Sequence, residues 1–306
     1  MTSVSLLSII KSLFKKIRES EVTFVRRYDG RRLKSIGPFI KISPYIMNRR
    51  SDAQIFAKQV ICTDSIDEYI HKKREQNFKI SYMHLFIAIY LRVIAERPQL
   101  NRFVMNSQLY SRKGVFISMA VKRSLHDEGE ETTVKFAFTG HENIFEIIDI
   151  INRKISENTE AGIKTETDRI AARIMSMPGI AKKMLVGLLK SMDRNNLLPR
   201  SIIDISPFHT TLFFSYLKSI KTGYVYHHLY DTGTTGIFVA LGKVEEIPLV
   251  ENDAVVIRNC CKIGYTFDER ICDGLYLANS LKLVKKYIEN PYLLETGLAE
   301  IVEDVK

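Results

Sequence analysis

The sequence predicts an α+β layered fold, with a mixed sheet flanked by helices. Predicted strands and helices follow one another without the regular strand-helix-strand alternation of a doubly wound sheet. The 306 residues are 45% hydrophobic, which is enough to bury a core. We expect a basic N-terminal segment, residues 1–35, followed by a single domain, residues 36–306.

The N-terminal segment carries most of the excess charge. Residues 1–50 hold twelve Lys and Arg against three acids, +9 of the net +10. Five apolar residues recur there at helical spacing, with lysines on the remaining faces: Leu6, Ile10, Leu13, Phe14 and Ile17. Such a helix packs against its own subunit or against a neighbouring one. Alternatively, it contacts a membrane surface or an acidic partner through residues 1–20. Because the charge is not spread over a folded face, we expect no nucleic-acid partner.

The first half of the domain alternates extended and helical patterns. Strands are predicted at 38–42 and 57–62, and Asp64 is a candidate cap for a helix over 65–77. The apolar run Tyr82–Ala95 is too short to span a bilayer and predicts a buried helix that ends before Pro98.

The second half continues the mixed pattern. Strands are predicted at 101–105, 114–121 and 132–138, then helices over 143–155 and 160–196, ended by Pro199. Three further strands, at 210–217, 236–249 and 254–267, precede a last helix from about Asp273.

The cysteine pattern and the N-terminus indicate a reducing, cytoplasmic location. Cys62, Cys260, Cys261 and Cys272 show no CxxC spacing, and adjacent cysteines are a poor disulfide framework. The first residues lack a basic stretch before the apolar part and a small-residue cleavage site, so they do not predict a secretory signal.

The segment "FDERICDG", Phe267–Gly274, resembles the catalytic motif Asp-His-Arg-x-x-Asp-Gly of the dihydrolipoyl acyltransferases of 2-oxoacid dehydrogenase complexes, and more distantly that of chloramphenicol acetyltransferase. Asp268, Arg270, Asp273 and Gly274 match by position, whereas Glu269 replaces the histidine. The helix before Pro98, the strand "GVFISMAV" and the strand "TTLFFSYL" extend the likeness over about three quarters of the chain.

The resemblance implies a chloramphenicol acetyltransferase-like fold and a homotrimer whose active sites lie between subunits. Coenzyme A or acyl-CoA is then a substrate rather than a covalent cofactor, and the acceptor is a small molecule or is carried by another protein. The chain shows no lipoyl-bearing domain and no Pro/Ala-rich linker. The strongly apolar runs Tyr82–Ala95 and Ile180–Met192 also favour self-association.

The replacement of the family histidine by Glu269 leaves the activity open. The family histidine is a general base, which contributes about 10²–10⁴ in rate. An ordinary glutamate has a pKa about two units below that of histidine, so Glu269 is the weaker base unless burial raises its pKa. We therefore keep two hypotheses: an acyltransferase with Glu269 as the base, and a catalytically degenerate trimeric scaffold or ligand-binding relative.

The resemblance also implies roles for other residues of the site. Asp268 and Arg270 are expected to hold the turn together. Asp273 either caps the last helix or pairs with an arginine that fixes the catalytic loop, and Gly274 is a candidate substrate contact. Ser215 falls where the family's hydroxyl donates to the oxyanion, a contact worth about 3–4 kcal/mol, or is an ordinary strand serine.

The roles of two further segments remain open. Of the adjacent His227 and His228, candidate substrate-binding residues, at most one is expected to face the channel, either as a displaced base or as a binding group. They lack the Cys and His partners of a metal site, and we predict none. The apolar stretch Met177–Met192 predicts a core or subunit-packing helix, or a flexible wall for a long acyl chain.

Overall fold

A computed structural model describes residues 27–122, 131–159 and 166–306. In this part of the chain a six-stranded mixed sheet has the order β2-β9-β8-β7-β5-β6. β7 runs parallel to β5 and β8, and the other pairings are antiparallel. The mixed sheet confirms the predicted α+β class. Its strands are β2 (Gln54–Cys62), β5 (Val115–Lys122), β6 (Glu131–Phe138), β7 (Leu212–Tyr216), β8 (Ile237–Glu251) and β9 (Ala254–Asp268).

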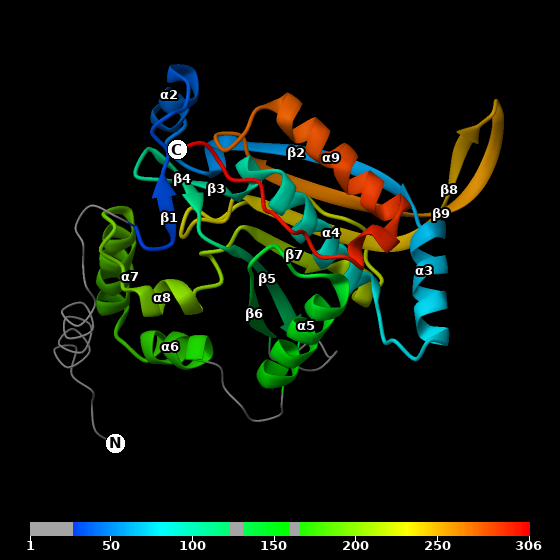
Figure 1. The fold of residues 1–306 in the computed structure, drawn as a ribbon. Helices are drawn as coiled ribbons and strands as arrows, with labels where there is room; N and C mark the ends of the chain where they lie inside the picture. Colours follow the sequence, from blue (N-terminus) through cyan, green and yellow to red (C-terminus); the bar gives the residue numbers. More distant parts are fainter. Residues whose placement is uncertain (1–26, 123–130, 160–165) are drawn as a thin grey trace.

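One face of this sheet is covered by helices and the other, here called the outer face, is not (Figure 1). The four covering helices contribute residues to the same core as the sheet. They are α3 (Asp64–Glu75), α4 (Tyr82–Glu96), α5 (Ile144–Thr159) and α9 (Gly274–Glu289). Strand alternation sets the two faces: Ile237 and Val239 of β8 enter the core, whereas Phe238 between them belongs to a small cluster on the outer face.

The helix α4 is buried almost all round. Ser81 caps its N-terminus, and all of its residues except Met83 and Glu96 are buried within this chain. The prediction of a buried helix ending before Pro98 is confirmed. The sequence argument that this apolar run favours self-association was wrong for α4, because the helix is already buried within one chain and has no apolar face left for a second subunit to cover.

A small three-stranded sheet and four further helices lie beside the main sheet (Figure 1). The strands, in order, are β1 (Gly30–Arg32), β4 (Gln108–Arg112) and β3 (Arg102–Met105). The helices are α2 (Pro38–Ile46), α6 (Glu166–Met175), α7 (Gly179–Arg194) and α8 (Arg200–Ile205). Short 3₁₀ turns are η1 (Ser51–Ala53), η2 (Pro98–Asn101), η3 (Leu217–Ile220) and η4 (Pro291–Leu294).

These smaller elements contain most of the errors of the sequence prediction. The strand predicted at 38–42 is wrong: the segment forms α2, because Pro38 at the first helical position has the φ angle that a helix start needs. The strands β1 and β4 and the helix α8 were not predicted. The basic helix predicted around 6–17 lies outside the described residues.

An extended strap, residues 223–231, crosses the outer face of the sheet. Two glycines allow its backbone to approach the strands. A Cβ atom on Gly264 would lie 2.3 Å from the carbonyl oxygen of Val225, and one on Gly242 would lie 2.6 Å from the nitrogen of Tyr224. The strap therefore lies directly on β8 and β9, and it carries His227 and His228 onto the outer face.

Candidate active site

The motif turn after β9 is held by a buried ion pair. Arg270 donates to Asp268 through both Nε and Nη2 at 2.7 Å, and both residues are at most 3% exposed. Arg270 also donates from Nη1 to the carbonyl oxygen of Met47 at 2.7 Å. The expectation that these two residues hold the turn is confirmed. The paired charges fix the backbone on both sides of Glu269.

Glu269 lies at the tip of this turn with its side chain exposed to solvent. Its backbone N–H donates to the carbonyl oxygen of Ala53 at 2.9 Å, which joins the turn to the start of β2. The structure thus presents a carboxylate on a rigid base at the surface of the chain. Within one chain, the Glu269 side chain is open to solvent and is not enclosed in a cleft.

Asp273 acts as the N-cap of α9. Its Oδ1 accepts from the backbone N–H of Tyr276 at 2.8 Å, and the side chain is exposed. This geometry favours the capping interpretation, and the carboxylate that pairs with the motif arginine is Asp268. Gly274 begins the helix, and a Cβ atom there would meet nothing within 4 Å. That open space is compatible with a ligand contact, which remains a prediction.

Ser215 lies on the outer face of β7 and is half-buried. It alternates with Phe214 and Tyr216, which pack into the helix-covered core. Across the sheet Ser215 pairs with Ala240, and Ala240 pairs with Gly264. Glu269 follows Gly264 by five residues, just past the end of a strand two positions away, so ideal strand spacings put the Cα atoms of Ser215 and Glu269 about 19 Å apart. One chain does not bring the two together.

The two histidines of the strap have different surroundings. The ring of His227 lies flat on Phe238, with 4.0 Å between centroids, whereas His228 is exposed. Nδ1 of His227 donates to the carbonyl oxygen of His228 at 2.7 Å, so Nε2 is the acceptor nitrogen of the neutral ring. The strap lies closer to the motif turn than Ser215 does, because Phe238 pairs with Thr266, three residues before Glu269.

Arg50 connects the strap to the motif turn, and sequence reasoning missed it. It is buried, with Nε 3.5 Å from Asp268 Oδ2, and its Nη1 donates to the carbonyl oxygen of Tyr230 at 2.6 Å. Its backbone N–H donates to Asp231 Oδ1 at 2.9 Å. Burial lowers the pKa of the Arg50 guanidinium. These contacts join segments 180 residues apart, so no local pattern in the sequence predicts them.

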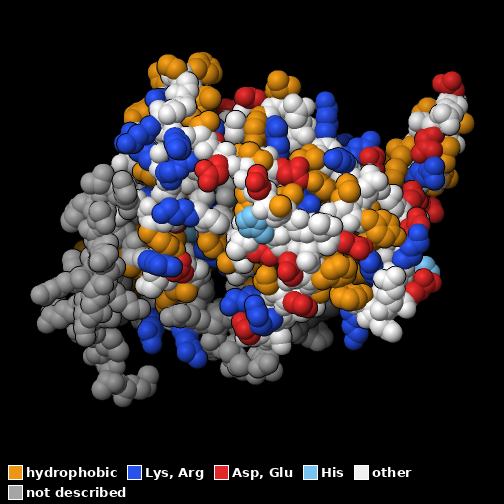
Figure 2. Space-filling view, in the orientation of Figure 1, with side chains coloured by type: hydrophobic (Ala, Val, Ile, Leu, Met, Phe, Trp, Pro, Cys, Tyr) orange, Lys and Arg blue, Asp and Glu red, His pale blue; other side chains and the backbone are white. Residues whose placement is uncertain are grey.

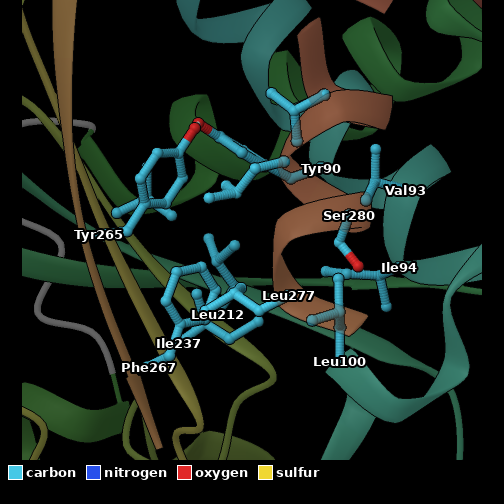
Figure 3. A pocket seen from close by; sticks show the side chains of 13 residues that line it. Tyr90, Val93, Ile94, Leu100, Leu212, Ile237, Tyr265, Phe267, Leu277 and Ser280 are labelled. Atoms are coloured by element: carbon cyan, nitrogen blue, oxygen red, sulfur yellow. The ribbon is translucent and has the colours of Figure 1, made fainter. Parts of the chain in front are cut away.

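A cavity in the core is separate from this surface. It has a volume of about 20 Å³ and lies between the sheet and helices α4 and α9, with almost wholly apolar walls (Figure 3). The hydroxyls of Tyr90 and Tyr265 meet at its edge, 3.1 Å apart. A space of this size holds about one water molecule, so we regard it as a packing defect and not as a substrate site.

Comparisons with known proteins agree with the motif. Residues 234–296 match the family model described as 2-oxoacid dehydrogenases acyltransferase (catalytic domain). A segment of 77 residues is 34% identical to a probable dihydrolipoyllysine-residue succinyltransferase component of a mitochondrial 2-oxoglutarate dehydrogenase complex from Schizosaccharomyces pombe. That match covers 24% of this chain and 17% of the relative.

Solved structures extend the likeness from the motif to the fold. A probable dihydrolipoamide acetyltransferase from Listeria monocytogenes aligns with a TM-score of 0.52 at 15% identity, covering 84% of this chain and 93% of that one. A truncated catalytic core of the 2-oxoacid dehydrogenase multienzyme complex from Thermoplasma acidophilum aligns at 0.51 and 14% identity, covering 85% and 98%. The chain therefore has the fold of the 2-oxoacid dehydrogenase acyltransferase catalytic domain, and over residues 234–296 it also has the sequence pattern of that family.

Proposed function

We propose that this protein is a CoA-dependent acyltransferase that moves an acyl group between coenzyme A and a thiol, hydroxyl or amine acceptor. The observation that carries the proposal is the position of Glu269. In the motif resemblance it takes the place of the family base, and the buried pair Asp268–Arg270 holds its turn. A rigid support of this kind is what a general base needs in order to meet a substrate proton.

The proposed reaction uses Glu269 and Ser215 in turn. The Glu269 carboxylate accepts the proton of the acceptor group as that group attacks the thioester carbonyl carbon. The Ser215 hydroxyl donates to the oxyanion of the tetrahedral intermediate. When the carbon–sulfur bond breaks, Glu269 returns the proton to the sulfur of coenzyme A. Acyl-CoA is thus a substrate, and the acceptor is a small molecule or a group carried by another protein.

We further propose that the site forms between subunits of a homotrimer. The separation of about 19 Å between Ser215 and Glu269 supports this, because two copies have to meet if the two residues share one substrate. Exposed apolar side chains also support self-association. Figure 2 shows them over α2 and along the projecting end of β8 and β9. On α2 they include Phe39, Ile42 and Ile46.

The projecting hairpin is the clearest surface for such contacts. β8 and β9 pair with each other up to Glu251 and Ala254, well beyond the last residues paired with β7 and β2 (Figure 1). Val250 and Val255 face each other near its end and are 76% and 72% exposed. A two-stranded hairpin is marginally stable alone in water, so a neighbouring subunit would stabilise it.

A second function rests on the exposure of Glu269. The base of the family is a histidine, and glutamate side chains in general are weaker bases than histidine, so the chain is alternatively a degenerate trimeric scaffold or ligand-binding relative. In either case we propose a cytoplasmic protein without a nucleic-acid partner. Contact with a membrane surface through residues 1–20 is part of the inference below.

Release of free coenzyme A from a panel of acyl-CoAs, with thiol, hydroxyl and amine acceptors, tests the proposal. The Glu269→Gln variant is expected to lose about 10²-fold or more in rate while it folds normally. Turnover that is unchanged in Glu269→Gln but lost in His227→Gln would assign the base to the strap. If the wild-type protein bound no coenzyme A even at about millimolar concentration, the enzyme proposal would fail. A Kd of that size corresponds to a binding free energy of about −4 kcal/mol.

A further inference from the structure

Helix α7 presents an apolar stripe to solvent. Ile180, Met184 and Leu188 recur every fourth residue and are 78%, 67% and 40% exposed. Of the residues of α7, Leu185, Met192 and Asp193 are buried. The stretch predicted as a core or subunit-packing helix, or as a flexible wall for an acyl chain, therefore buries only one side within the chain. Its outward stripe needs a partner or an apolar environment.

The charge within the stretch that carries this stripe has one sign. The stretch from Ser176 to Met192 contains three lysines and no acidic residue. Lys183 and Lys190 are exposed, and Lys182 is half-buried. Exposed apolar residues flanked by lysines are typical of helices that lie in the headgroup region of a bilayer. A partner for this surface has to be apolar and negatively charged.

The basic N-terminal segment joins the described structure at the end of the same helix. Arg27 is buried and donates from Nη1 to the carbonyl oxygen of Asp193 at 3.0 Å and from Nη2 to its Oδ1, also at 3.0 Å. Residues 1–20 precede Arg27 in the sequence, and they too combine lysines with apolar residues. An anionic surface attracts both lysine-rich segments.

We propose that α7 is a docking surface for an anionic lipid bilayer. Ile180, Met184 and Leu188 enter the headgroup boundary, and Lys183 and Lys190 pair with lipid phosphates. The lysines of residues 1–20 add to the attraction of the chain for the same anionic surface. Among the helices that the structure describes, none has the length and apolar content to cross a membrane, so the proposal is attachment to the bilayer surface.

Co-sedimentation with vesicles tests the proposal without using any catalytic activity. The full chain is expected to bind vesicles with about 30% phosphatidylglycerol in phosphatidylcholine, and to bind far less to pure phosphatidylcholine. Because the Debye length falls from about 10 Å to about 4 Å between roughly 0.1 M and 0.6 M salt, binding should weaken steeply over that range. Equal binding to both vesicle types, or none to either, overturns the proposal.

Matched lysine variants locate the surface. Lys183→Gln with Lys190→Gln is expected to weaken binding by about fivefold per lysine. Lys282→Gln with Lys286→Gln removes the same charge from α9 and should change binding by less than about twofold. If both pairs weaken binding equally, net charge and not α7 is responsible, which contradicts the proposal.

The apolar stripe is tested by Ile180→Glu with Met184→Glu, which should abolish vesicle binding while the circular dichroism spectrum and the oligomer mass stay unchanged. A fall in oligomer mass would instead assign the stripe to contacts between copies of this chain. If deletion of residues 1–20 removed all binding, and the α7 variants bound like the wild type, the contact would belong to the N-terminus alone. Either of these results overturns the assignment to α7.

Discussion

Ser215 lies on β7 and Glu269 directly follows β9 of the same sheet, and the strand register puts their Cα atoms about 19 Å apart. Ser215 lies in one row with Ala240 and Gly264, whereas Glu269 follows Gly264 by five residues. Rotation of side chains does not close such a gap. If both residues act on one substrate, each site has to be assembled from two copies of the chain.

Subunit mixing tests this arrangement. Ser215→Ala alone should lose about 10²–10³ in rate, and Glu269→Gln about 10²–10⁴. If every site takes one residue from each of two subunits, random reassembly of an equal mixture restores about one quarter of the wild-type sites. Assays of CoA release before and after subunit exchange measure the gain. No gain after exchange confirmed by mass spectrometry would contradict a shared site.

The buried pair at the motif turn predicts a large loss of stability. Asp268→Ala leaves Arg270 without its carboxylate and removes the nearest negative charge from buried Arg50. We expect the free energy of unfolding to fall by about 3–5 kcal/mol, measured by urea denaturation. Asp273→Ala, which removes an exposed helix cap five residues later, should cost only about 0.5–2 kcal/mol. Equal losses would show that Asp268 does not neutralise the buried arginines.

The projecting hairpin predicts a change in assembly. Val255→Glu places a charge on the exposed apolar pair with Val250, and we expect the mass by light scattering to fall from the trimer toward the monomer. Val302→Glu, at a valine that is 52% exposed in the C-terminal segment, serves as the control and should leave the mass unchanged. A trimer that survives Val255→Glu would exclude the end of the hairpin from the contact.

Lys135 predicts a pH dependence of stability. Burial, together with the charge of Arg112, lowers its pKa to about 7, while a lysine in the unfolded chain titrates near 10.4. Between these values the unfolded state binds more protons, so the free energy of unfolding should rise with pH from about 7 to about 10. Below pH 7 Lys135 is charged in both the folded and the unfolded state, so it no longer makes the free energy of unfolding depend on pH.

Comparison with Lys135→Met isolates the contribution of this lysine. The difference in urea midpoint between the variant and the wild type should shift in favour of the wild type as the pH rises from about 7 to about 10. Lys58→Met, at an exposed position, should show the same difference at both pH values. A pH-independent difference for Lys135→Met would show that its amine keeps an ordinary pKa in the folded state.

The sequence by itself determined the elements with strong local signals. Tyr82–Ala95 is apolar all round and becomes the buried helix α4, and the long alternating runs before and after residue 252 become β8 and β9. The motif around Glu269 is local too, because its residues are neighbours in the chain. In each case the pattern lies within a few turns of helix or one strand, where short-range periodicity reflects burial.

Tertiary structure alone decided the contacts between distant segments. Residues 38–42 have an extended pattern but form part of α2, and Arg50 meets Asp268 and Tyr230 across about 180 to 220 residues of chain. The separation of Ser215 from Glu269 follows from strand order and register, to which every strand of the sheet contributes. The sequence motif identifies these residues as site candidates. The distances between them depend on how whole strands pair, because the register of a strand is set by the burial of an entire face of the sheet.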